Sequence, residues 1–179
     1  MKTIIPVNRM NRVVINCFVI LGIFVVSILI RLPALVNAEH LFFSDEAFMA
    51  VAIQELMNGS PIFYNYEGVT YHGVLGGLTA IPFMKILGVE SLAFKLPGTL
   101  YYSLYVWSTY LLAKVIVPRM AFLVVILMIV PTPAVLSITL NNWPHTEIAF
   151  LGNIIFLLFI YIKTNDRKSV REVFFLFFF

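Results

Sequence analysis

Apolar stretches separated by short polar segments run along almost the whole chain. Each stretch is rich in Val, Ile, Leu and Phe, and the helical spans that they predict cover residues 13–30, 96–117, 120–138 and 147–162. A transmembrane helix needs roughly 20 mainly apolar residues to cross the hydrocarbon core of a bilayer. A further apolar stretch at 74–88 is shorter than this and contains Pro82 and Lys85. The pattern predicts an all-α integral membrane protein, built as a multi-span helical bundle.

The positions of the basic residues decide how the stretch 74–88 is interpreted. If this stretch spanned the membrane, the basic patches at 114–119 and 163–171 would both lie outside, against the tendency of Lys and Arg to stay on the cytoplasmic side. If it lies at the outer interface instead, both patches become cytoplasmic, and only Lys85 and Lys95 remain outside. We therefore predict four spans, with a cytoplasmic N-terminus, in the plasma (inner) membrane.

Composition excludes several other classes of protein. Hydrophobic residues make up 61% of the chain and charged residues 12%, and the mean hydropathy is +0.96, values typical of integral membrane proteins. The basic residues form no tract dense enough to bind nucleic acid. A single cysteine, Cys17, excludes a framework of intramolecular disulfides.

The two ends of the chain each raise a question of their own. Basic residues precede an apolar run that ends near "VNAE", a pattern that would also suit a cleaved signal peptide. Residues 13–30, about 18 in number, are longer than the apolar part of a usual signal, so an uncleaved first helix is preferred. At the other end, "VFFLFFF" (173–179) opens a further apolar segment that stops short of a crossing, and we expect a truncated chain.

The first predicted external loop contains an acidic pair in apolar surroundings, "LFFSDEAFMA". No Lys or Arg occurs in residues 32–84. Ser44 suits a helix N-cap, and Asp45 and Glu46 then occupy the first turn, where the helix dipole favours negative charge. We predict a juxtamembrane helix over 45–58.

A second acidic position begins the fourth predicted span. The sequence "NNWPHTE" places His145 and Glu147 on the same side of the membrane as Asp45 and Glu46 under the predicted topology. A carboxylate at an apolar interface costs free energy unless it has a partner, which favours a functional role. A plain helix-start charge and an interfacial histidine are the simpler interpretation, and both interpretations remain open.

Three sequence stretches resemble one family. "RLPALVNAEHLFFSDEAFMAVAIQELMNGSPIFY" resembles the first external loop of the GT-C class of polyprenyl-phosphate-sugar-dependent glycosyltransferases, the superfamily of protein O-mannosyltransferases and lipid A aminoarabinose transferases. In that family an Asp-Glu pair, followed by Ala and an apolar helix, recurs after the first span. "FKLPGTL" is similar to the family's "(R/K)LP" start of the second span, and "NNWPHTEIAFLG" to its "GGH-x-E" sequence. The resemblance covers residues 31–162.

The resemblance implies transfer of a sugar from a polyprenyl-phosphate donor to an acceptor hydroxyl at the outer face. Such a reaction needs a base for the acceptor proton and stabilisation of the departing phosphate. The resemblance assigns Asp45 as the general base, Glu46 as an anchor or as a group that shares the proton, and Glu147 as a further catalytic carboxylate. The residues expected to bind substrate are His145, His72, Lys85, Lys95 and Glu67.

The departing phosphate has two candidate stabilisers. Lys85 and Lys95 are the only predicted external bases, although lysines at this depth also simply extend toward the headgroups. Alternatively, a divalent metal ion would be held by Asp45 and Glu147 if the two external loops meet. Both options remain open.

A function from another class is a non-enzymatic membrane protein, such as a transporter or channel subunit or an assembly partner. A transport pathway requires polar or ionisable residues through the spans. The predicted spans contain a few Ser and Thr residues but no ionisable residue in their interiors. Family members usually have many more spans, so we expect the parent protein to be a glycosyltransferase and this shorter chain to be inactive alone.

Overall fold

The computed structural model describes residues 7–41, 43–61, 65–66, 69–73, 75–130, 139–141 and 144–164. Helices dominate this part of the chain, which confirms the predicted helical class. Their bounds are α1 (Val7–Val36), η1 (Ala38–Leu41), α2 (Ser44–Met57), α3 (Leu75–Leu87), α4 (Ser91–Ile116), α5 (Ala121–Ile129) and α7 (Pro144–Thr164). A small antiparallel hairpin of β1 (Asn65–Tyr66) and β2 (Val69–Gly73) accompanies the helices and was not predicted.

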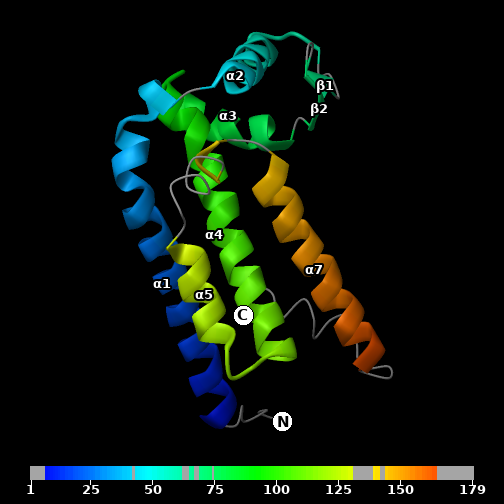
Figure 1. Cartoon of the computed structure of the whole chain (residues 1–179). Helices are drawn as coiled ribbons and strands as arrows, with labels where there is room; N and C mark the ends of the chain where they lie inside the picture. The colour runs from blue at the N-terminus through cyan, green and yellow to red at the C-terminus, as the bar shows by residue number, and fades with distance from the viewer. Residues whose placement is uncertain are drawn as a thin grey trace, which may run out of the picture.

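The central element is α4, which contacts α1, α5 and α7 along its length. Figure 1 shows α1 and α5 on one side of α4 and α7 on the other. Large apolar and aromatic side chains of α1, α4 and α5 form the core of this bundle. Its buried members are Ile23, Tyr102, Val106, Trp107, Val125 and Ile129.

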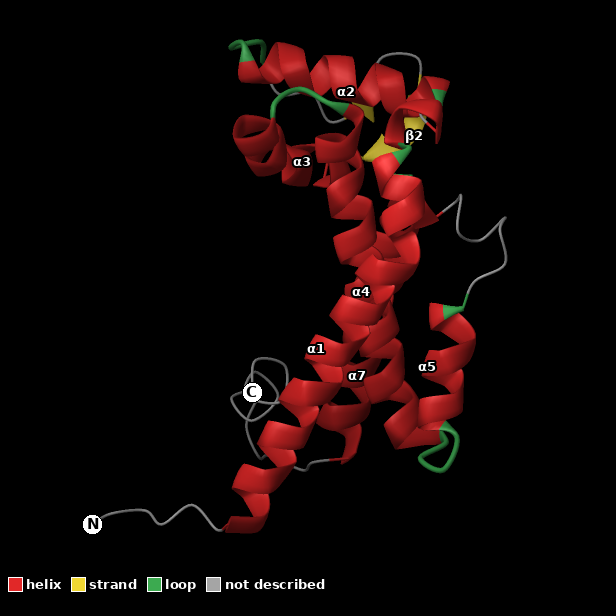
Figure 2. Cartoon of the chain, turned by 90° about the vertical axis from the view of Figure 1, so that its left-hand side faces the viewer, coloured by secondary structure: helices red, strands yellow, loops and turns green. Residues whose placement is uncertain are grey.

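The helices α2 and α3, with the β1–β2 hairpin, lie across one end of the bundle, and we call this layer of α2, β1, β2 and α3 the cap (Figure 1, Figure 2). A second apolar core joins α2, α3 and the first turn of α4, with Met49, Ile53, Ala80, Met84, Ala93 and Phe94 buried. Gly59 and Gly88 follow α2 and α3 with φ values of 101° and 91°. Glycine adopts this left-handed conformation without a steric penalty, so both helices end there and the chain turns back over the bundle.

Apolar side chains also cover the outside of the bundle. Phe18 on α1, Leu127 on α5 and Phe159 on α7 are 70%, 68% and 62% exposed. Two helical segments, Val14–Val36 and His145–Lys163, are long and apolar enough to cross a membrane. Helix α4 is not one of these segments, because it interleaves apolar residues with Tyr, Ser and Thr. Among the described residues, two segments therefore meet the criteria of length and apolar composition, and the four spans remain a prediction.

The helix bounds differ from the predicted spans at several points. Helix α1 starts before residue 13 and continues past residue 30 to Val36, so Arg31 lies inside the helix rather than after it. Helix α4 starts at Ser91 rather than at residue 96, and it therefore includes Lys95. The described part of α5 ends at Ile129, and the end of that predicted span and the segment 173–179 lie outside the described residues.

Candidate functional site

The acidic pair lies at the start of α2, but its capping differs from the expected arrangement. Phe43, rather than Ser44, occupies the N-cap position. The backbone N–H of Phe43 donates to Oε2 of Glu46 at 3.4 Å, whereas Oγ of Ser44 donates to Oδ1 of Asp45 at 3.4 Å. The carboxylate of Glu46, three residues after the N-cap, thus accepts the hydrogen bond of the N-cap backbone N–H, as the acidic residue of a capping box does.

Glu46 forms a buried ion pair with Lys95 at the start of α4. Nζ of Lys95 lies 2.5 Å from Oε2 of Glu46, and both side chains are 0% exposed. Nζ of Lys95 also donates to Oδ1 of Asn141 at 3.2 Å, and Asn141 is itself buried. Burial lowers the pKa of Lys95, and the charge and hydrogen bond of Glu46 oppose that shift. Lys95 therefore connects the cap to the segment 139–141.

The close packing at this point depends on a glycine. A Cβ atom on Gly98 would lie 2.9 Å from the backbone oxygen of Asn141 and 3.3 Å from that of Leu140. Gly98 lies one turn after Lys95 on α4, so both residues face the same segment. The absence of a side chain lets the backbone of residues 140 and 141 approach α4 closely enough for Asn141 to reach Lys95.

Asp45 occupies a different environment from Glu46. Neighbouring residues in an α-helix point about 100° apart, so the two carboxylates diverge from the first turn of α2. Asp45 is half-buried, whereas Glu46 is buried against α4. The structure thus separates the acidic pair into an inward-facing carboxylate with a cationic partner and a more accessible one beside it.

The second acidic position, Glu147, lies in the first turn of α7, which begins at Pro144. Glu147 is 4% exposed, and its Oε2 atom has no hydrogen-bond partner among the described residues. Tyr101 of α4 interacts electrostatically with Glu147, and α7 also contacts α3. Glu147 is therefore buried where α3, α4 and α7 meet.

Both acidic positions lie at the cap end of α4. Lys95 and Tyr101 are six positions apart (101 − 95), which corresponds to a rise of about 9 Å along the helix. Glu46 contacts the first of these residues, and Glu147 interacts with the second. Within the described ranges, no three His, Cys, Asp or Glu side chains group so as to hold a metal ion.

The remaining predicted substrate-binding residues are dispersed. Lys85 lies in the last turn of α3 and is exposed, and His145 is exposed beside Thr146 at the start of α7. The backbone of His72 lies in β2, which is separated along the sequence from the first turns of α4 and α7. Glu67 lies outside the described residues. Among these candidates, Lys95 contacts the acidic pair, through its ion pair with Glu46.

Sequence reasoning missed Arg31, whose side chain is 0% exposed inside α1. Its Nη2 atom donates to Oγ1 of Thr139 at 3.1 Å, its Nη1 atom donates to the carbonyl of Ser27 at 3.4 Å, and its guanidinium lies 3.6 Å from the centre of the Tyr102 ring. No ion pair joins Arg31 to a carboxylate of the described ranges. In the sequence, Arg31 stands directly after an apolar run, and this position suggested only a residue at the membrane interface that flanks the helix.

A polar contact between α4 and α7 was also missed. Nδ2 of Asn153 donates to Oγ of Ser108 at 3.1 Å and to Oγ1 of Thr109 at 2.8 Å. Both hydroxyls donate in turn to the carbonyl oxygen of Tyr105. The sequence signal for this contact was a single Asn in one apolar stretch and an adjacent Ser and Thr in another.

The site as a whole offers a half-buried carboxylate (Asp45), a buried carboxylate (Glu147) that has no cationic partner among the described residues, and a lysine (Lys95) neutralised by a third carboxylate (Glu46). Such a set suits proton transfer and the binding of hydroxyl groups. No protein-family model, curated protein or solved structure matches this chain. A function for this chain is therefore inferred from the geometry of the site and from the resemblance of its short motifs.

Proposed function

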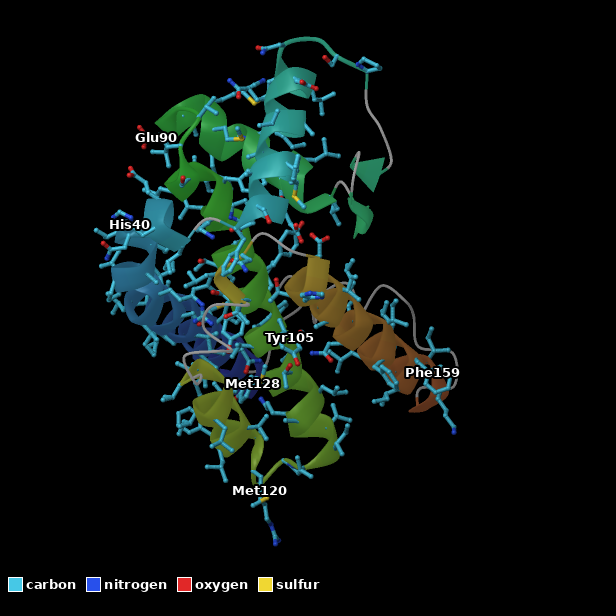
Figure 3. The ribbon with its side chains drawn as sticks, turned by 45° about the horizontal axis from the view of Figure 1, so that its top comes forward. His40, Glu90, Tyr105, Met120, Met128 and Phe159 are labelled. Carbon is cyan, nitrogen blue, oxygen red and sulfur yellow. The ribbon has the colours of Figure 1, made fainter. Side chains whose placement is uncertain are left out.

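We propose that the chain spans a membrane with its cap at the outer surface. The distribution of charge supports this topology. The acidic residues of the described ranges gather at the cap end, where Figure 3 places Glu90 and His40, and the turn at Met120 lies at the opposite end. Lys114 and Lys163 lie in the last turns of α4 and α7, away from the cap. Basic residues favour the cytoplasmic side, so the cap would face outward.

In this arrangement we assign to the chain itself the activity of a glycosyltransferase that uses a polyprenyl-phosphate sugar as donor. This replaces the expectation from the sequence that the chain is inactive alone, because the acidic pair and the lysine that holds it both lie within the chain. The observation that carries the proposal is the division of the acidic pair: Glu46 is held by Lys95, and Asp45 beside it stays half-buried at the cap end. A base must combine access to the acceptor with a fixed position. The ion pair supplies the fixed position, because it anchors the first turn of α2 to α4.

The reaction follows from this placement. Asp45 accepts the proton of the acceptor hydroxyl while the acceptor oxygen forms a bond to the anomeric carbon of the donor sugar. The bond between that carbon and the phosphate oxygen breaks, its electron pair stays on the oxygen, and polyprenyl phosphate departs. Lys95 is already neutralised by Glu46, so the exposed Lys85 is the better candidate to meet the phosphate.

The test is release of polyprenyl phosphate by the full chain in nanodiscs, with a polyprenyl-phosphate hexose as donor and extracted membrane lipids and hydroxyl-bearing peptides as acceptors. Asp45→Asn should reduce release by about 10²–10⁴-fold, the usual contribution of a general base. Glu55→Gln is the matched control, since Glu55 is exposed on the same helix. Absence of release by the unaltered chain, or equal release by Asp45→Asn, would contradict the proposal.

Arg31 favours a second candidate function, a transport protein. A buried ionisable residue inside a membrane span commonly belongs to an ion pathway, and Arg31 lies inside the segment Val14–Val36. This function predicts anion flux in proteoliposomes that is lost in Arg31→Met and retained in Asp45→Asn. The glycosyltransferase function predicts instead that sugar transfer is lost in Asp45→Asn and retained in Arg31→Met.

A further inference from the structure

The C-terminal end of α3 projects beyond the structure that the rest of this helix covers. Gly76, Ala80 and Met84 form the buried stripe of α3, four positions apart along the helix. Leu87 continues this stripe by its position, yet it is 45% exposed. Residues 85–90 are all exposed, and Figure 2 shows α3 extending to one side of the bundle. We call residues 85–90 the overhang.

The exposed surface of the overhang is mainly apolar. Ile86 and Val89 are 80% and 52% exposed. Pro82, one turn before Ile86, is also exposed, so the apolar surface continues along α3. The charged residues of the overhang, Lys85 and Glu90, stand at its two ends. A contiguous exposed apolar surface of this kind marks contact with another protein or with a membrane.

The overhang lies on the same side of the molecule as the cap end of a candidate membrane span. Val36 is the last residue of the segment Val14–Val36, which is long and apolar enough to cross a membrane, and it is 73% exposed. The helix η1, which comes shortly after Val36, contacts α4. Figure 3 places His40 of η1 and Glu90 on the same side of the molecule. The lipid that surrounds the end of such a span would therefore also meet the overhang.

We propose that the overhang inserts into the outer leaflet of the bilayer and fixes the depth of the cap. The inference rests on the proposed function, because it requires a membrane-spanning chain whose cap faces outward. A helix at the interface buries its apolar side about 5–10 Å into the boundary between headgroups and acyl chains. Lys85 suits this position, because the stem of a lysine lies along apolar surface while its ammonium group reaches the headgroup phosphates. Bilayer lipid is favoured over a second protein, since lipid that covers Val36 reaches the overhang without any further component.

Insertion of the overhang holds Asp45 at a defined height above the acyl chains. Helix α2 packs on α3, with Met49 and Ile53 in the same apolar core as Ala80 and Met84, and it lies on the side of α3 away from the bundle (Figure 2). The axes of packed helices are about 8–10 Å apart. With α3 at the acyl boundary, the first turn of α2 therefore lies at the level of the headgroups. The phosphate of a lipid-linked donor lies at this level too, so the overhang aligns the proposed base with the bond that breaks.

The experiment measures the accessibility of spin labels on the full chain in nanodiscs of phosphatidylethanolamine and phosphatidylglycerol. With Cys17 replaced by Ser, single cysteines replace Ile86 and Val89 in turn and carry a nitroxide label. Collisions with oxygen, which concentrates in lipid, are compared with collisions with a water-soluble nickel chelate. Relative to a label in water, Ile86→Cys and Val89→Cys should raise the ratio of oxygen to nickel collisions at least about threefold, as expected for side chains below the headgroups.

Two reference positions calibrate the measurement. Phe159→Cys places the label on the exterior of α7, where Phe159 is 62% exposed, and it should report lipid. Glu55→Cys places the label on the exposed side of α2, and it should report water. Neither position belongs to the overhang, and each label replaces a side chain that the structure exposes.

The outcomes separate the inference from the proposed function. If Phe159→Cys reports lipid while both labels on the overhang resemble Glu55→Cys, insertion is overturned and the membrane topology stands. Labels on the overhang that neither reagent reaches would mean that protein covers this surface, and this too would overturn insertion. If Phe159→Cys itself reports water, the proposed topology fails and insertion fails with it.

Discussion

The ion pair between Glu46 and Lys95 gives the sharpest test of how the cap is held. Replacing Lys95 with Met removes the ammonium group but keeps an unbranched side chain that fills much of the same space. The carboxylate of Glu46 then remains buried without a cationic partner. Both side chains are 0% exposed and their charged atoms are 2.5 Å apart, so this pair belongs to the buried class, in which removal of one partner costs about 3–5 kcal/mol.

This cost corresponds to a measurable shift in thermal stability. For a chain of 150–250 residues, 1 kcal/mol changes the melting temperature by roughly 2–4 °C. Lys95→Met should therefore lower the melting temperature by about 6–20 °C. Adding Glu46→Gln should recover more than half of this loss, because the double variant no longer buries an unpaired charge.

The measurement is thermal unfolding of the purified full chain in detergent, followed by circular dichroism. Lys85→Met is the matched control, since Lys85 is exposed, and it should change the free energy of unfolding by no more than about 0.5 kcal/mol. If Lys95→Met shifts the midpoint no more than Lys85→Met does, the reasoning is refuted. Lys95 would then again be available to bind the donor phosphate, as the sequence alone suggested.

Three further variants test contacts around α4 by the same unfolding assay. Gly98→Ala should destabilise the chain by about 1–3 kcal/mol, because its Cβ would lie 2.9 Å from the backbone oxygen of Asn141; an unchanged midpoint would mean that this approach is looser. Asn153→Leu should cost about 1 kcal/mol through its two interhelical hydrogen bonds, and a midpoint equal to or above that of the unaltered chain would contradict this. Arg31→Met should leave the midpoint unchanged or raise it, because it removes a buried charge that has no carboxylate partner in the described ranges, and a drop of several degrees would contradict it.

The sequence predicted those features of the fold that depend on residues close together in the chain. Runs of apolar residues predicted the long helices, and the acidic pair before an apolar segment predicted the start of α2 to within one residue. The shortness of the stretch 74–88, together with the basic patches, separated α3 from the long helices, and α3 lies across the end of the bundle (Figure 2). Length, composition and capping act within a few residues, so they can be recognised without the fold.

The contacts that define the site could not be predicted, because they join positions far apart in the chain. Lys95 lies 49 positions from Glu46, and Arg31 lies 108 positions from Thr139. From the sequence, Lys95 could be read equally as a snorkelling residue or as a phosphate ligand, and only the approach of α2 to α4 decides that it is buried with Glu46. Likewise, Arg31 looked like an interfacial flank because nothing local indicates that α1 continues through Pro33.

The register between α4 and α7 links the stability of the bundle to the geometry of the site. The hydroxyls of Ser108 and Thr109 are committed as donors to the carbonyl of Tyr105, so they remain as acceptors for Nδ2 of Asn153. Sliding α7 by one turn, about 5.4 Å, would break both bonds in an apolar environment. Because Glu147 precedes Asn153 by less than two turns of the same helix, this contact also fixes where the buried carboxylate meets α3 and α4. Asn153 thus acts as a positioning residue for Glu147, as Lys95 does for the first turn of α2.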